Sequence, residues 1–135
     1  MLYKQFYSEL GKLLYAVADI DGIITPREKT ILQDIVRKEL MPSEKHIDEY
    51  GTNAALYAEI EFDFLQDEDA DAETAFESFV NFVEDHHTAF DKKMRNICVH
   101  VATRLASEYY GTNRKEEELV TRLKQMFSKL KTTAQ

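Results

Sequence analysis

The sequence predicts an all-α protein, a compact bundle of about seven helices, and three observations support this class. Gly and Pro are few, four and two in 135 residues, whereas all-β chains need frequent turns and disordered chains lack large apolar residues. Hydrophobic residues make up 44% of the chain and include 8 Phe and 7 Tyr, enough for a core without disulfides. Apolar residues also recur at steps of three and four along most of the chain.

The first two helices have the clearest signals. Apolar positions from Leu10 to Val17 follow the helical period and predict an amphipathic helix over residues 2–18. The run from Thr25 to Glu28 combines a capping hydroxyl, a proline at the first helical position and a glutamate three residues after the cap. The hydroxyl and the carboxylate can accept hydrogen bonds from backbone N–H groups at the start of a helix, and proline has no N–H that would need a partner there. The run therefore predicts the beginning of a second helix.

The other helices are predicted from the same spacing between turn signals. The five segments begin near Pro42, Ala54, Ala72, Thr88 and Asn113. Asp91 and Glu116 would complete the caps formed by Thr88 and Asn113. Residues 60–64 alternate like a strand, but no partner strand is evident, which favours a helix. We expect one domain over residues 1–131 and a frayed tail over 132–135.

The net charge of -8 is distributed unevenly. Residues 46–91 contain 14 Asp and Glu and no Lys or Arg, whereas residues 92–135 contain ten basic and four acidic side chains. We expect the last third to neutralise the middle third. The alternative is that the acidic region from Glu59 to Glu73 docks a basic protein partner. Nucleic acid is not an expected partner, because the overall negative field would repel a polyanion.

Two further features indicate where the protein acts. Cys98 is the lone cysteine and lies among apolar residues, which is typical of a buried side chain rather than a reactive thiolate. The start of the chain lacks a signal-peptide pattern, and no apolar run approaches the roughly 20 residues of a membrane span. We therefore expect a cytoplasmic protein that does not enter a membrane. Neither the oligomeric state nor a particular partner follows from the sequence.

The loop between the first two helices carries the candidate metal site. Gly22 allows a tight turn that would bring Asp19, Asp21 and Glu28 together, and clustered carboxylates suit a divalent cation such as calcium. The spacing matches the later part of an EF-hand loop, but Val17 stands where that loop begins with an aspartate. The alternative needs no metal: Glu28 completes the cap of the second helix, Asp21 and Gly22 make the turn, and Asp19 is solvated.

These residues resemble the TerB-like family, which occurs in tellurite-resistance TerB proteins and in some membrane-anchored DnaJ-like co-chaperones. The resemblance is carried by residues 14–19, residues 21–25 and Glu28. It implies a compact all-α protein linked to bacterial stress responses, acting as a binding or regulatory module rather than as an enzyme. It also implies that Asp19, Asp21 and Glu28 hold a metal ion.

Residues 104–111 and 113–118 are similar to a second, decayed copy of the same pattern. Glu117 follows Gly111 by six residues, as Glu28 follows Gly22. The resemblance therefore implies a weak two-part internal repeat, with Glu108 and Glu117 as weaker metal-binding positions. Tyr109 and Tyr110 replace the acidic turn in this copy, which argues against a complete second site.

No other group of residues predicts catalysis. Glu84 and His87 have the spacing of a di-iron ligand pair, but the chain has no second Glu-x-x-His motif. We expect His86 and His87 to interact with the C-terminus of a helix instead. Because nucleophile motifs and phosphate-binding loops are absent from the sequence, we expect neither catalytic residues nor an organic cofactor.

Overall fold

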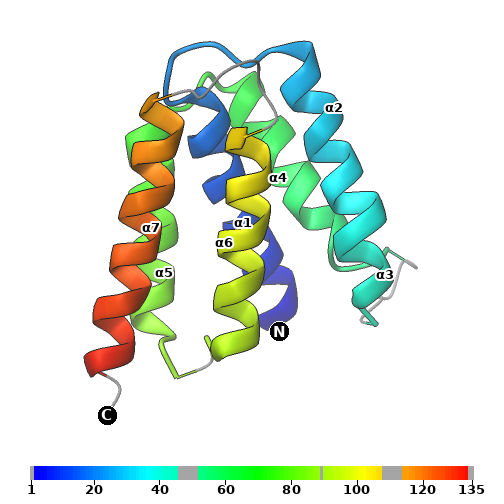
Figure 1. Ribbon diagram of the computed structural model, residues 1–135. Helices are drawn as coiled ribbons and strands as arrows, with labels where there is room; N and C mark the ends of the chain where they lie inside the picture. Colours follow the sequence, from blue (N-terminus) through cyan, green and yellow to red (C-terminus); the bar gives the residue numbers. More distant parts are fainter. Residues whose placement is uncertain (1, 46–51, 89, 108–113, 134–135) are drawn as a thin grey trace.

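The computed structural model describes residues 2–45, 52–88, 90–107 and 114–133, and all the elements in these ranges are helical (Figure 1). The elements are α1 (Leu2–Asp19), α2 (Pro26–Asp34), η1 (Ile35–Leu40), α3 (Met41–Ser43), α4 (Leu56–Asp67), α5 (Ala72–Asp85), α6 (Lys92–Ser107) and α7 (Arg114–Thr133). The predicted all-α class is confirmed. Within the described ranges, every helix is too short or too polar to cross a bilayer.

Helix α1 lies at the centre of the bundle and packs against α4, α5, α6 and α7 (Figure 1). The sequence predicted one apolar face, but every side chain from Leu13 to Ala18 is buried. The small side chains of Ala16 and Ala18 let neighbouring elements approach the face that does not carry the leucines. A helix buried on all sides needs partners around its whole circumference, and the surrounding helices supply them.

The second predicted helix is longer than expected. Helix α2, the π-helical segment η1 and the short α3 follow one another without a break from Pro26 to Ser43, so the predicted interruption after Leu40 is wrong. The wider turn of η1 precedes Pro42, whose ring would crowd the preceding turn of a regular α-helix. The helix predicted to restart at Pro42 falls partly on residues 46–51, outside the described residues. The count of seven helices therefore stays a prediction.

An aromatic cluster forms part of the core around Phe90. This residue lies in the segment between α5 and α6. Its ring packs against Phe6 of α1, Phe82 of α5 and Phe127 of α7 at centroid distances of 5.6, 5.8 and 6.4 Å. The Cys98 side chain is fully buried in the same core, and this burial raises the pKa of its thiol. The predicted burial of Cys98 is thus confirmed.

Aspartates cap α5 and α6. Asp71 accepts a hydrogen bond from the backbone N–H of Thr74 at 2.9 Å, as expected for the start of α5. Asp91 accepts one from the backbone N–H of Met94, also at 2.9 Å. The predicted cap at Thr88 is therefore wrong: α6 begins after Asp91, because the chain between α5 and α6 includes Phe90, whose ring must reach the core.

We predict that Gly11→Ala destabilises the protein. A Cβ at Gly11 would lie 2.4 Å from the backbone oxygen of Ala58, so α1 and α4 would have to separate. In an isolated helix the same change would stabilise by about 1 kcal/mol, whereas overpacking here should cost about 1–3 kcal/mol. Urea unfolding measures the difference. Ser8→Ala on α1 is the control and should stay within about 0.5 kcal/mol of wild type; a stabilised Gly11→Ala variant would contradict the close packing of α1 on α4.

Candidate functional site

Glu28 closes the first turn of α2. Its backbone N–H donates to Thr25 Oγ1 at 3.1 Å, and its Oε1 accepts a hydrogen bond from the backbone N–H of Thr25 at 2.9 Å. Pro26 occupies the first helical position, where a missing N–H has no cost. The predicted capping box is confirmed, and it explains the orientation of Glu28 but not its burial.

Glu28 is buried against Glu116, the third residue of α7. The two side chains are 2% and 1% exposed, and their carboxyl groups share a hydrogen bond. Glu28 Oε1 is used by the cap, and the described residues offer Oε2 no N–H or hydroxyl donor outside this contact. Both glutamates are the third residue of their helix, so the partial positive charge of two helix N-termini acts on one buried pair.

Burial determines how many protons the pair holds. It raises the pKa of Glu28, a rise that hydrogen bonds from Thr25 and Glu116 oppose. Burial also raises the pKa of Glu116, to about 9, and the negative charges of Glu28 and Asp21 add to this rise. At neutral pH Glu116 therefore keeps its proton and donates it to the Glu28 carboxylate. Two carboxyl groups so close together carry one negative charge rather than two.

Asp21 lies beside this pair, whereas Asp19 faces a different neighbourhood. Asp21 Oδ1 accepts a hydrogen bond from the backbone N–H of Ile23 at 3.0 Å and so closes the turn at Gly22, whose φ is 88°. The charge of Asp21 acts on both glutamates. The predicted turn is therefore present, and Asp21 and Glu28 come close to each other as the sequence suggested.

The Asp19 side chain is directed toward the loop between α4 and α5. Burial raises its pKa, the charges of Asp69 and Asp71 add to this rise, and a hydrogen bond from Tyr15 opposes it. The Tyr15 hydroxyl has a single proton, which it shares between Asp19 and the backbone oxygen of Ala70, 2.6 Å away. The charge of Asp21 also raises the pKa of Asp19, so Asp21 acts on two acidic neighbourhoods, Glu28 with Glu116 and Asp19 with Asp69.

Of the two weaker predicted positions, only Glu117 can be compared with the pair, and it does not join it. Glu117 is exposed on α7, and Glu108 lies outside the described residues. Among the residues that the structure describes, no group of three or more His, Cys, Asp or Glu side chains is arranged to hold a metal ion. What the structure adds is Glu116, which the sequence indicated only as a capping residue.

A sequence signal for the burial of Glu116 exists. Leu119, Val120 and Leu123 follow Glu116 by three, four and seven residues, and all three are buried. Glu116 therefore stands on the apolar stripe of α7, one turn before its first leucine. A carboxylate at such a position must find a partner inside the protein.

The Glu84 and His87 pair is part of the end of α5. His87 Nδ1 lies 3.2 Å from the backbone oxygen of Glu84, and His86 Nδ1 lies 2.9 Å from that of Phe82. Both rings thus contact the carbonyl oxygens at the C-terminus of the helix, as predicted.

No protein-family model matches the chain, and neither a curated protein nor a solved structure matches it at a significant level.

We predict that Glu116 makes stability fall as pH rises. The folded protein keeps the Glu116 proton up to about pH 9, whereas the unfolded chain releases it near the ordinary value of 4.5, so unfolding releases a proton between these values. The loss is at most about 1.4 kcal/mol per pH unit. Urea unfolding across this range should show that the stability advantage of wild type over Glu116→Gln shrinks with pH.

Glu117→Gln is the matched control, because Glu117 is the exposed neighbour of Glu116 on α7. Its stability should run parallel to that of wild type at every pH. If the Glu116→Gln curve also ran parallel to wild type, Glu116 would not hold its proton in the folded protein.

Proposed function

We propose that this protein is a TerB-like regulatory module that binds a divalent cation between Glu28 and Glu116, with Asp21 at the edge of the site. The observation that carries the proposal is the buried contact between two carboxyl groups from different helices. A cation would replace the shared proton there. Calcium and similar hard cations prefer carboxylate oxygens as ligands.

The chemistry of the pair supports cation binding. Two buried carboxylates repel each other strongly unless a positive charge lies between them, so a cation gains affinity from the same burial that raises the two pKa values. Ligand carboxylates must lose their protons first, which makes binding stronger at higher pH. Asp21 is close enough to influence both glutamates, so its charge adds to the negative field of the pair without making it a three-ligand cluster.

The position of the pair also supports the two-part internal repeat. Glu28 and Glu116 each occupy the third position of a helix, one in the first half of the chain and one in the last. The spacing from the glycine aligns Glu28 with Glu117, and on this proposal the neighbouring Glu116 takes the metal-binding role in the second copy. A cation bound there would tie α2 to α7 and stabilise one arrangement of the bundle. Such a change could be sensed by a protein partner, as expected of a stress-associated regulatory module.

Calcium titration monitored by Tm tests this proposal. A ligand that binds only the folded state stabilises it by about 2.7 kcal/mol at 100 times its Kd, so we expect the wild-type Tm to rise by several degrees. Glu28→Gln keeps an oxygen for the cap but removes the charge, and it should abolish the rise. Glu117→Gln, on the exposed face, should respond like wild type. An equal response of wild type and Glu28→Gln would show that the pair is not the site.

A second candidate function is docking of a basic protein partner on α4. Ile60 and Phe64 are one helical turn apart, and their side chains are 53% and 57% exposed. Asp67 and Glu68 beside them are also exposed, and residues 46–91 contain no Lys or Arg. Adjacent exposed apolar side chains bordered by one sign of charge favour an amphipathic partner of the opposite charge.

A synthetic amphipathic peptide with leucines on one face and lysines beside them is the probe for this second candidate. We expect it to bind the full chain, to bind more weakly at high salt, and to lose about tenfold in affinity with Phe64→Ser. Ile23→Ser is the control, because Ile23 is 65% exposed but lies outside α4. Fluorescence anisotropy of the labelled peptide measures the affinity; equal losses for the two variants would rule out docking at α4.

A further inference from the structure

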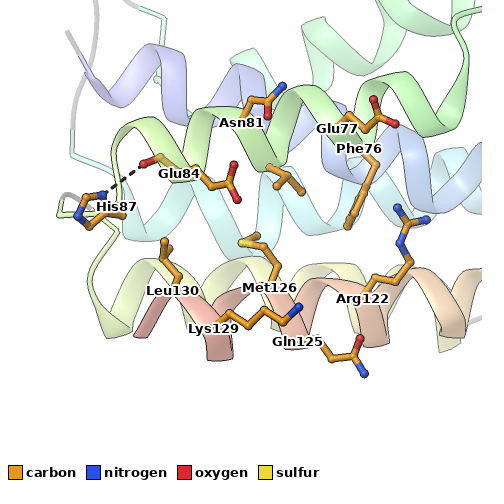
Figure 2. A pocket seen from close by; sticks show the side chains of 11 residues that line it. Phe76, Glu77, Asn81, Glu84, His87, Arg122, Gln125, Met126, Lys129 and Leu130 are labelled. Atoms are coloured by element: carbon orange, nitrogen blue, oxygen red, sulfur yellow. Dashed lines mark hydrogen bonds between the residues drawn. The ribbon is translucent and has the colours of Figure 1, made fainter. Parts of the chain in front are cut away.

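A hollow of about 780 Å³ separates the outer faces of α5 and α7. Phe76 and Val80 of α5 and Met126 and Leu130 of α7 form its apolar floor. Figure 2 shows Phe76 directed toward α7, and Met126 and Leu130 directed toward α5. Val80, Met126 and Leu130 are only partly buried, so this floor keeps apolar surface exposed to solvent along two neighbouring helices.

The dimensions of the hollow suit a helix. Its lining extends from Phe76 to Glu84 along α5, which is about 12 Å at 1.5 Å per residue and corresponds to a little over two helical turns, and His87 follows beyond the end of α5. Arg122 holds one end of the hollow together, because its guanidinium lies 4.7 Å from the centre of the Phe76 ring and 2.7 Å from Glu73. The groove therefore lies between two helices, α5 and α7, that run in the same direction (Figure 1).

The two edges of the groove carry opposite charges with the same spacing. Glu77 and Glu84 lie along α5, and Arg122 and Lys129 lie along α7 (Figure 2). Each pair is seven residues apart, which is two helical turns. Side chains that repeat every seven residues beside an apolar seam are the pattern by which helices select a partner helix and its orientation.

We propose that this groove docks an amphipathic helix of a partner protein. The partner helix would place apolar side chains on the floor, basic side chains seven residues apart toward Glu77 and Glu84, and acidic side chains toward Arg122 and Lys129. A single helix matches the concave shape, whereas the grooves of two copies facing each other would enclose a void. Because about two turns of helix bury less area than the roughly 800 Å² per partner of a stable interface, the contact is transient.

Two labelled synthetic helices of about 18 residues test the proposal on the full chain. One carries the charge pattern just described, and the other has its basic and acidic positions exchanged. Fluorescence anisotropy should show that the first binds at least about tenfold more tightly. The double variant Glu84→Lys, Lys129→Glu should abolish this preference, because each edge of the groove would then carry one positive and one negative charge.

The matched control exchanges charges elsewhere: the double variant Glu117→Lys, Lys115→Glu on exposed positions of α7 keeps the composition and should leave the preference unchanged. Equal Tm values would show that both double variants are folded. Equal affinity of wild type for the two peptides, or an unchanged preference in Glu84→Lys, Lys129→Glu, would overturn the proposal. Sedimentation that shows a homodimer dissociated by the groove variant would overturn it as well, because the occupant would then be a second copy of the chain.

Discussion

The burial of α1 on all sides is the constraint on which the rest of the structure depends. Every side chain from Leu13 to Ala18 is removed from solvent, so helices must pack around the whole circumference of that segment. Gly11 permits the closest of these approaches, because its missing side chain leaves room for the backbone of α4. The loop that leaves the C-terminus of α1 turns at Gly22 and brings the charge of Asp21 near Glu116 at the start of α7.

The Glu28 and Glu116 pair is a consequence of this arrangement, and it is costly. A buried carboxylate loses its hydration, and two of them in contact also repel. The capping hydrogen bonds, the two helix N-termini and one shared proton offset these costs. A site that requires one positive charge to be stable can take it from a proton or from a cation. This property links the structural role of the pair to its proposed function.

The acidic residues of the middle third form ion pairs with basic residues of both other thirds, whereas the sequence suggested pairing with the last third alone. Arg122 in the last third binds Glu73, as the expected neutralisation of the middle third requires. Two other acidic residues of the middle third are bound from the first third instead: Lys29 contacts Asp63, and Arg37 contacts Glu59 at 3.1 Å. These contacts occupy one flank of α4, and its acidic residues beyond Phe64 stay exposed. The groove between α5 and α7 combines both signs of charge.

What the sequence by itself determined is local: the helical period, the capping box at Glu28, the turn at Gly22 and the contact of His86 with the end of α5. Each depends on residues within a few positions of one another. Only the tertiary structure decided that Glu116 faces Glu28, that Asp19 is directed toward Asp69, and that residues 13–18 of α1 are buried on all sides. These features join segments far apart in the chain, and their geometry follows from how the helices pack. The stripe on α7 indicated that Glu116 is buried, but no local signal identifies the residue that a buried carboxyl group will meet.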